Sequence, residues 1–488
     1  MKSRLLAFAL VLWLCNVALG QSALKSSSPI KPPAGSTPCN MDAGQAKQDR
    51  LAPPAAHTQP DDAYSIALKY VTVFYPRWFT YTQSAVGPCN QLIGPARISP
   101  IYHAVVAIND DTVYASTFVG VKQEPTIVTI PATTTNYSVL QLDQYGNVFS
   151  GIPDNMPGLY GLIPPEWQGT LPPNVIPVPV PYDYTELIFR ADKYVNNQDM
   201  HLEADKFRRN LHAASLSDWM NDPNSGQTSI LAEAYFAFPY KGLAVGLINN
   251  APLAFLVSLQ EAVHAATTQV PSQQEQMLSD AFDQAFADPV NYPLLIAGTQ
   301  DAEKAFNANY LAQVYPGTTW VTMTDIGEWS TDPQGYLNRS SLTNFIQYGN
   351  NHNAAVYYHA FFDSDKMRLD GSKASYTITF PRGQQPDVKR FWSLTAYMGV
   401  GVELVPNDDN KYVVASYTPN LVTADDGSVT VLLSNQRPPN FPEANWLPTP
   451  LGPFSVMLRA YGPQNPVFKL KGSTYNNTYA PPPVTRLP

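Results

Sequence analysis

Hydrophobic and polar residues alternate along two separate parts of this chain. In the first part, apolar residues recur in short segments bounded by Pro, Gly and Asn, which predicts strands over Asp111 to Val121, Thr126 to Ile130, Tyr137 to Tyr145 and Val175 to Val180. In the last part, two further strands each place three large apolar residues on one face: Tyr376, Ile378 and Phe380, then Phe454, Val456 and Leu458. Each part therefore predicts a β-sandwich.

The period changes to that of a helix between about His201 and Val314. Leu278, Phe282 and Phe286 recur every four residues and share one helical face. The segment Ser272–Glu275 has the capping-box spacing that begins a helix. A shorter helical pattern covers Ala63 to Phe79, so helices are expected both before the first sandwich and between the two.

These patterns together predict a mainly β protein with an α insert: two antiparallel, jelly-roll-like β-sandwich domains separated by a helical segment. The predicted divisions are a signal peptide over residues 1–20, a Pro/Ser-rich leader over 21–60, the N-terminal sandwich over 61–200, the helical segment over 201–350 and the C-terminal sandwich with its Pro-rich tail over 351–488. A length of 488 residues is too great for one hydrophobic core.

The composition of the chain argues against two classes of partner, nucleic acids and the interior of a membrane. Charged residues make up only 14% of the chain, and its formal net charge is −9. An acidic chain without a cluster of Lys and Arg lacks the electrostatic footprint of a nucleic-acid-binding protein. The most apolar later segment, Gly242 to Leu259, is interrupted by Asn249, Asn250 and Pro252, so no membrane span is expected.

The N-terminus predicts export. Lys2 and Arg4 precede an apolar run from Leu5 to about Val17, and small residues follow up to Gly20, the expected cleavage site of a secretory signal peptide. The mature protein is therefore expected to be secreted.

Two cysteines remain after cleavage, in near-duplicate contexts: Cys39 and Cys89 each follow Pro and precede Asn. An oxidising export route favours a Cys39–Cys89 disulfide, and the alternative is two unpaired thiols. Three N-glycosylation sequons begin at Asn136, Asn338 and Asn476, and they matter only in a eukaryotic host and at the surface.

Ordered motifs in the last third of the chain resemble those of a known family. They are Tyr376–Phe380, Phe391–Tyr397, Asp426–Ser428, Asn445–Pro448 and Gly452–Arg459. This series resembles domain of unknown function 1214. Three motifs nearer the N-terminus resemble its usual companion, domain of unknown function 1254. They are Asn109–Thr112 with Tyr114, Tyr145–Asn147 with Phe149, and Trp167–Gly169. The resemblance implies two β domains and carries no general chemistry.

The strongest polar constellation combines Asn109, Asp111 and Tyr114, and we take these three as candidate catalytic residues. Alternate residues of a strand share a face, so Asp111 is expected beside Asn109 while Asp110 points away. Asp110 and Asp111 then cannot act as opposing acids of a glycosidase. The alternative is an Asx turn at the start of a strand, with a purely structural role.

Four further residues are candidates for substrate binding: Tyr145, Asn147, Arg190 and Trp446. Tyr145 and Asn147 are expected beside a pocket that Asp111 and Tyr114 would reach. Trp446 could stack on a ring or sugar, and Arg190 could bind a ligand or form a buried ion pair. For Trp446, in a Pro-rich segment, a core position is equally compatible with the sequence.

A metal site is conceivable at His352, His359 and Asp363, because a seven-residue spacing would align both histidines on a helix. However, Val356 to Phe362 has the pattern of a strand, which removes that alignment. We predict no metal and no cofactor. Motifs for a serine hydrolase elbow, a zinc protease, a P-loop and a dinucleotide site are absent from the sequence.

The leading hypothesis is a secreted, cofactor-independent enzyme that uses acid–base chemistry, hydrolytic or isomerising, on a small or oligomeric substrate. Two alternatives remain: an extracellular carbohydrate-binding or wall-associated glycoprotein, and a tailoring enzyme of a small-molecule pathway. Each expects a small-molecule or carbohydrate ligand, and a homo-oligomer is compatible with all three.

Overall fold

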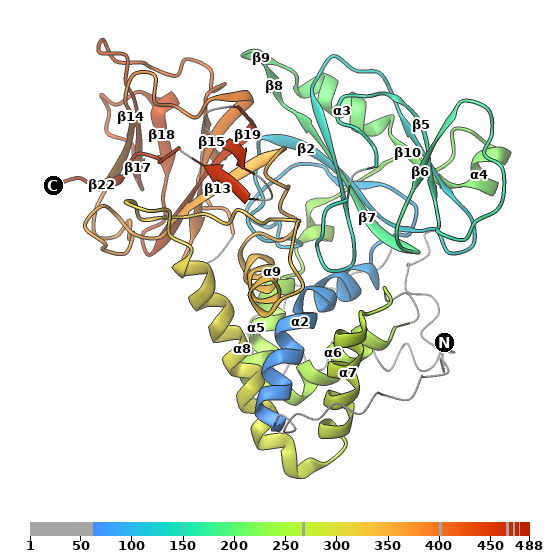
Figure 1. The fold of residues 1–488 in the computed structure, drawn as a ribbon. Coiled ribbons are helices and arrows are strands. Elements are labelled where there is room, and N and C mark those ends of the chain that lie inside the picture. The colour runs from blue at the N-terminus through green and yellow to red at the C-terminus, as the bar shows by residue number, and fades with distance from the viewer. Residues whose placement is uncertain are drawn as a thin grey trace.

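Two β lobes lie side by side above a bundle of helices (Figure 1). The computed structural model describes residues 62–149, 151–265, 269–399, 403–464, 468–471, 474–477 and 479–488. Helix and strand occupy nearly equal shares of the chain, so the prediction of a mainly β protein is wrong, and the architecture is mixed α/β. The described part of the chain contains more helix than the sequence pattern predicted: it has eight α-helices, of which the two longest have 22 and 21 residues.

The N-terminal lobe is formed by two sheets. The five-stranded sheet has the order β11 (Ser229–Leu231), β1 (Ile93–Pro95), β2 (Thr112–Gly120), β7 (Tyr184–Asp192) and β4 (Tyr137–Leu142). The four-stranded sheet has the order β10 (His212–Ser215), β3 (Thr126–Ile130), β5 (Gly158–Ile163) and β6 (Val175–Pro179). Side chains of both sheets, with α3 (His201–Arg209), form one apolar cluster, as in a sandwich. The short α4 (Leu216–Asn221) and the hairpin of β8 (Tyr194–Val195) and β9 (Gln198–Asp199) flank this lobe.

The C-terminal lobe repeats the same arrangement of five and four strands. Its larger sheet has the order β12 (Trp320–Val321), β13 (Ala355–Ala360), β19 (Phe454–Pro463), β15 (Val388–Met398) and β16 (Val413–Ala415). Its smaller sheet has the order β18 (Trp446–Pro448), β17 (Val429–Ser434), β14 (Tyr376–Phe380) and β22 (Val484–Arg486). A hairpin of β20 (Phe468–Lys471) and β21 (Thr474–Asn477) follows β19. The two predicted apolar faces, one on β14 and one on β19, both lie in the core between these sheets, which confirms that part of the pattern.

The sheets are not purely antiparallel, as the sequence had suggested. β1 pairs with β11, β5 with β6, and β17 with β18 in parallel. A parallel pair needs a crossover connection, and the residues between β5 and β6 run as such a loop from one end of the sheet to the other. The jelly-roll topology expected for the lobes is not confirmed.

The helical bundle is built around α2 (Ala63–Ser84), which begins at the N-cap Asp62, whose carboxylate accepts a hydrogen bond from Ser65 N. Against α2 pack α6 (Pro252–His264), α7 (Gln273–Phe286), α8 (Tyr292–Ala312) and α9 (Pro333–Phe345), while α5 (Tyr240–Asn250) packs against α6 and α8 in the same apolar cluster. The capping box predicted at Ser272 and Glu275 is present and begins α7. Three short 3₁₀ turns complete the described elements: η1 (Glu233–Phe236), η2 (Pro289–Asn291) and η3 (Glu443–Asn445). None of the described helices has both the length and the hydropathy needed to cross a bilayer.

Each five-stranded sheet has an inner face, which packs in the core of its own lobe, and an outer face. The outer faces of the two sheets lie against each other. Along β15 and β19, one set of alternate residues enters the C-terminal core, and the other set joins a separate cluster that includes Tyr102 and Ile108 of the N-terminal half. An ion pair links these facing sheets, because Arg390 of β15 binds both carboxylate oxygens of Asp192 on β7, with Nε 2.9 Å from Oδ2. Burial raises the pKa of Asp192, and the Arg390 guanidinium opposes that shift.

We expect Arg390→Ala to destabilise the protein strongly, because Asp192 would remain as a fully buried carboxylate without its counter-charge. Removing one partner of a buried ion pair costs about 3–5 kcal/mol of the free energy of unfolding. Urea unfolding measures this loss. The neighbouring exposed residue supplies the control: Lys389→Ala should leave the free energy of unfolding nearly unchanged. Equal stabilities of the two variants would contradict a structural role for the ion pair.

Candidate functional site

A cavity of about 70 Å³ lies between the two facing sheets. Its walls come from β2 and β7, from the loop over residues 102–109, from the segment over 346–350 that follows α9, and from β13 and β19. A water needs about 10–15 Å³ of such space, so the cavity has room for about five waters or one small molecule. Both lobes and the segment that follows α9 therefore contribute to one site.

The N-terminal wall follows from the alternation of side chains along β2 and β7. Glu186, Ile188 and Arg190 occupy every second position of β7, and all three line the cavity. The residues between them, Leu187 and Phe189, point the opposite way into the core of the sandwich. One strand thus supplies apolar residues to a core and two ionisable side chains, Glu186 and Arg190, to a cavity.

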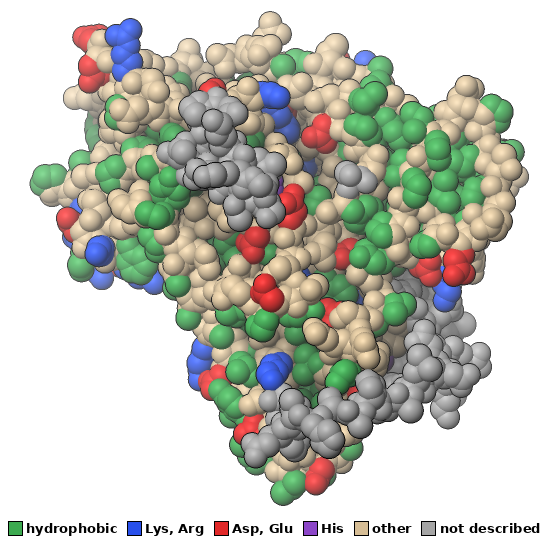
Figure 2. Space-filling view, in the orientation of Figure 1, with side chains coloured by type: hydrophobic (Ala, Val, Ile, Leu, Met, Phe, Trp, Pro, Cys, Tyr) green, Lys and Arg blue, Asp and Glu red, His purple; other side chains and the backbone are tan. Residues whose placement is uncertain are grey.

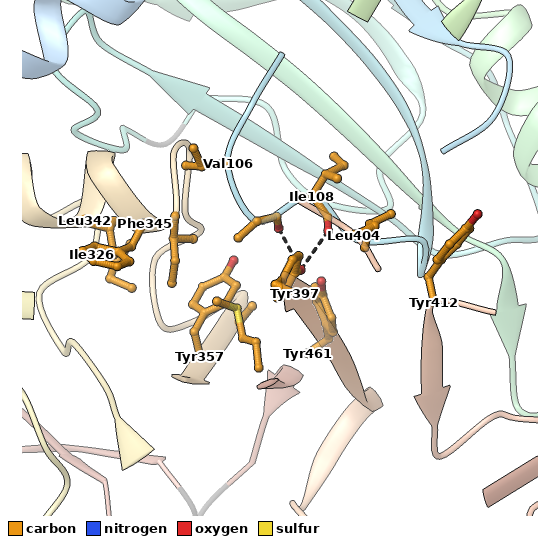
Figure 3. Close-up of a cluster of buried hydrophobic side chains, with 14 of the residues drawn as sticks. Val106, Ile108, Ile326, Leu342, Phe345, Tyr357, Tyr397, Leu404, Tyr412 and Tyr461 are labelled. Carbon is orange, nitrogen blue, oxygen red and sulfur yellow. Dashed lines mark hydrogen bonds between the residues drawn. The ribbon is translucent and has the colours of Figure 1, made fainter. Parts of the chain in front are cut away.

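The C-terminal wall carries tyrosines and one arginine. Tyr357 of β13, and Arg459 and Tyr461 of β19, line the cavity. Figure 3 shows Tyr357, Tyr397 and Tyr461 rising from the C-terminal sheet toward the loop that carries Val106 and Ile108. The Tyr397 hydroxyl donates to the backbone carbonyl of Ile108 at 2.8 Å, so the sheet anchors this loop.

Glu186 is a buried carboxyl group with an unsatisfied oxygen. Only 6% of the residue is exposed, and its Oε2 atom has no hydrogen-bond partner among the described residues. Burial raises the pKa of Glu186 from 4.5 to about 8, while the Tyr348 hydroxyl and the Arg190 guanidinium oppose that shift. The side chain is therefore mostly protonated at neutral pH and can both donate and accept a proton near that pH.

Arg190 is held against the opposite segment of the cavity wall. Its Nη1 donates to Asn350 Oδ1 at 2.9 Å, and its Nη2 donates to the carbonyl of Tyr348 at 3.0 Å. The guanidinium also lies 5.7 Å from the ring centroid of Tyr114, within the range of a cation–π contact. These contacts fix the cation at the cavity without an ion pair among the described residues.

Asn109 connects the two halves of the site. Its Nδ2 donates to the Tyr461 hydroxyl at 2.5 Å, and its Oδ1 accepts from the Tyr114 hydroxyl at 2.9 Å. The same Oδ1 lies 3.2 Å from the backbone nitrogen of Asp111, which gives Asn109 the hydrogen bond of an Asx turn. Of the three predicted catalytic residues, Asn109 and Tyr114 line the cavity.

Asp111 is fully buried outside the cavity lining. Its two oxygens accept hydrogen bonds from Ser393 Oγ at 2.7 Å and from the Tyr417 hydroxyl at 2.6 Å, both from the C-terminal lobe. Burial raises its pKa, and the hydrogen bond from Tyr417 and the charge of Arg459 oppose the shift. Asp111 thus joins the two lobes behind the cavity, while Asp110 pairs with Lys193.

Two residues of the cavity wall have an unusual backbone conformation. Ala107 and Tyr348 have φ angles of +50° and +59°, in the left-handed region that only Gly adopts freely. Such conformations cost of order 1–3 kcal/mol each and persist where the surrounding contacts hold them. Ala107 is held through its carbonyl, which accepts from Arg459 Nη2 at 2.7 Å.

The remaining predicted binding residues lie away from the main cavity. Tyr145 lines a second cavity of about 20 Å³, beside Arg339, whose guanidinium is 4.9 Å from the Tyr145 ring. Asn147 donates to Asp143 Oδ2 at 2.7 Å within a turn. Trp446 is buried in the C-terminal lobe, where its Nε1 donates to the carbonyl of Ser434 at 3.1 Å. The structure therefore brings together only Asn109, Tyr114 and Arg190 from the predicted set.

The candidate metal ligands do not converge. His359 lies on β13, as its strand pattern predicted, and its ring nitrogens face Ser455 Oγ at 2.9 Å and the Tyr310 hydroxyl at 3.2 Å. Asp363 accepts backbone hydrogen bonds in a turn. Within the described ranges, no group of three His, Cys, Asp or Glu side chains is placed to hold a metal ion.

Several predicted modification sites fall on poorly accessible or undescribed residues. Asn136 is half-buried, and Asn338 lies on α9, where its Nδ2 donates to Asp325 Oδ2 at 2.8 Å. The side chain of Asn476 lies outside the described part of the chain, and so do Cys39, the leader and the signal peptide. The disulfide and the sequons stay predictions.

The sequence reasoning missed Glu186, Tyr348, Tyr357 and Tyr461. A signal for Glu186 was present, because the otherwise apolar run Tyr184–Asp192 carries charged residues at positions 186 and 190, which share one face of a strand. Two charges on the face of a central strand require a polar environment. For the tyrosines no comparable local signal exists.

Comparison with protein families confirms the resemblance seen in the motifs. Residues 89–214 match the family model DUF1254, and residues 354–465 match DUF1214, each described as a protein of unknown function. Both predicted families are present in the predicted order. No curated protein matches this chain.

Among solved structures, the VPA0106 protein from Vibrio parahaemolyticus is similar, with a TM-score of 0.57 and 19% sequence identity. The similarity covers 87% of this chain and 100% of that chain. An uncharacterised protein from Burkholderia cenocepacia gives a TM-score of 0.39 and 14% identity over 83% of this chain and 93% of its own. The first similarity shows a shared fold.

Substitution of Asp111 tests its structural position. Asp111→Ala leaves the Ser393 and Tyr417 hydroxyls without their acceptor and removes a negative charge near Arg459, so we expect a loss of about 3–5 kcal/mol in the free energy of unfolding. Asp110→Ala, which disrupts a more exposed pair, should cost no more than about 1 kcal/mol in the same urea titration. An Asp111→Ala protein as stable as Asp110→Ala would show that the buried contacts are not structural.

Glu186 should make the stability depend on pH. In the unfolded chain it loses its proton above about pH 4.5, and in the folded chain only above about pH 8, so its contribution is fully present below pH 4.5 and declines as the pH rises to 8. Relative to Glu186→Gln, the wild-type protein should lose about 1.4 kcal/mol per pH unit over that interval. Urea titrations of both proteins from pH 5 to pH 8 measure the difference. A difference that does not change with pH would mean that Glu186 is ionised in the folded protein.

Proposed function

We propose that the protein is an enzyme that performs acid–base chemistry on a small molecule bound between the two sandwiches. Glu186 would transfer the proton, and Arg190, Tyr114 and Asn109 would orient the bound molecule. The observation that carries this proposal is the free oxygen of a buried, mostly protonated carboxyl group that lines a cavity large enough for a ligand. General acids and bases work best when their pKa lies near the operating pH.

Two further features support the proposal. The cavity is walled by hydrogen-bonded tyrosines, which can donate to a substrate oxygen, and two of its wall residues are held in left-handed backbone conformations. Strained residues concentrate at functional sites, where the surrounding structure holds them. A module with only a structural role does not require such a polar and enclosed space.

The rival proposal is a secreted carbohydrate-binding or wall-associated protein. Binding to an insoluble polysaccharide usually relies on exposed aromatic rings, and none of the exposed large hydrophobic side chains in the described ranges is aromatic. On the face in Figure 2, charged side chains of both signs are scattered and do not gather into a patch of one sign. These observations favour the enzyme, and export, proposed from the N-terminal sequence, is compatible with either.

Untargeted mass spectrometry of medium and cells would test the enzyme proposal. A compound should accumulate in a strain that lacks the gene and in a strain that carries Glu186→Gln, because loss of a general acid or base slows catalysis about 10²–10⁴-fold. The control strain carries the same chemical change at an exposed site, Glu166→Gln, and should match the parent. Identical profiles in all strains would favour a binding protein instead.

A further inference from the structure

The cavity carries an excess of positive charge. Arg190 from β7 and Arg459 from β19 reach it from opposite walls. Among the described residues that line it, Glu186 is the only one with a carboxyl group, and burial keeps that group mostly protonated at neutral pH. Asp111 lies behind Arg459 and is engaged by Ser393 and Tyr417. The space between the two sheets therefore favours an anion.

Arg459 has a donor that the described residues leave unused. Its Nη2 donates to the Ala107 carbonyl at 2.7 Å and to the Tyr397 hydroxyl at 2.6 Å. Its Nη1 is buried, like the rest of a side chain that is 1% exposed, and has no partner in the described part of the chain. A buried cationic donor without an acceptor is costly, and an acceptor brought by a ligand would remove that cost.

We infer that the cavity binds a small organic acid, with its carboxylate on Nη1 of Arg459 and its reacting end toward Glu186. A guanidinium binds a carboxylate through charge-assisted hydrogen bonds, which are stronger than neutral ones. A space for about five waters suits acids of about two or three carbon atoms. This inference rests on the proposed function, because it names the class of molecule on which Glu186 would act.

The anion and the protonated carboxyl group depend on each other. The titratable and charged groups that face Glu186 are Arg190 and Tyr184 on its own strand, Tyr348 from the segment after α9, and Tyr102 from the loop. Burial raises the pKa of each of these tyrosines, so they stay neutral at the pH where Glu186 titrates. Ionised Glu186 would repel a carboxylate, and binding should weaken as the pH rises above about 8.

Calorimetric titration with acetate and glycolate tests the inference, with acetamide as the neutral analogue and sodium chloride to keep the ionic strength constant. Acetate or glycolate should bind to the full chain, and acetamide should not. Above about pH 8 the affinity of the wild-type protein should fall about tenfold per pH unit, and in Glu186→Gln this fall should be absent.

A substitution of Arg459 tests whether the carboxylate of the bound acid lies on its guanidinium. Arg459→Lys keeps the charge but removes the planar donor pair, so we expect the affinity for acetate to fall at least tenfold. Arg382→Lys, the same change at an exposed residue away from the cavity, should bind acetate as the wild type does. Equal binding of acetate and acetamide, or unchanged binding by Arg459→Lys, would overturn the inference.

The outcomes separate this inference from the proposed function. If acetate binds as expected while the Glu186→Gln strain has the metabolite profile of its parent, the carboxylate site stands and the proposed enzyme does not. If neither acid binds, and the compound that accumulates in the Glu186→Gln strain is uncharged, the enzyme stands and the carboxylate site does not.

Discussion

The guanidinium of Arg459 is the group on which the centre of this molecule depends. It projects from a C-terminal strand on the side away from its own core, and its contacts reach the backbone carbonyl of Ala107 in the N-terminal half. A buried cationic donor gains stability from an acceptor, and the hydrogen bond from Nη2 to this carbonyl holds the loop over residues 102–109 close to the C-terminal sheet. That loop leads directly into β2 and sets the position of Asn109 and Tyr114. One cation thus orders the wall of the cavity.

Each large sheet has an apolar inner face and a more polar outer face, which explains how polar side chains can be buried in the middle of the molecule. The inner faces are apolar and fill two separate cores, as two sheets in any sandwich require. The outer faces meet each other, and they carry hydroxyls, amides and charges that satisfy one another across the gap. Two of these buried polar atoms, Oε2 of Glu186 and Nη1 of Arg459, have no hydrogen-bond partner among the described residues, and both residues line the cavity.

Much of this architecture follows from local pattern, and the site only in part. Strands such as β3 and the capping box of α7 follow directly from residue spacing. The balance of helix and strand does not, because α2 packs with helices that begin more than 160 residues after it ends, and such packing leaves no local pattern in the sequence. Asn109, Tyr114 and Arg190 were found because motif or alternation singles them out. Tyr357 and Tyr461 were not, because a buried tyrosine in a core and one facing a cavity have the same sequence pattern.

The walls of the cavity come from segments that are separated by most of the length of the chain. The region that matches DUF1254 contains Tyr114, Glu186 and Arg190, and the region that matches DUF1214 contains Tyr357, Arg459 and Tyr461. Neither domain holds a complete site, so neither can be exchanged, duplicated or inherited alone without loss of whatever the site does. A protein that carried only one of the two matched regions would therefore present only one wall of this cavity.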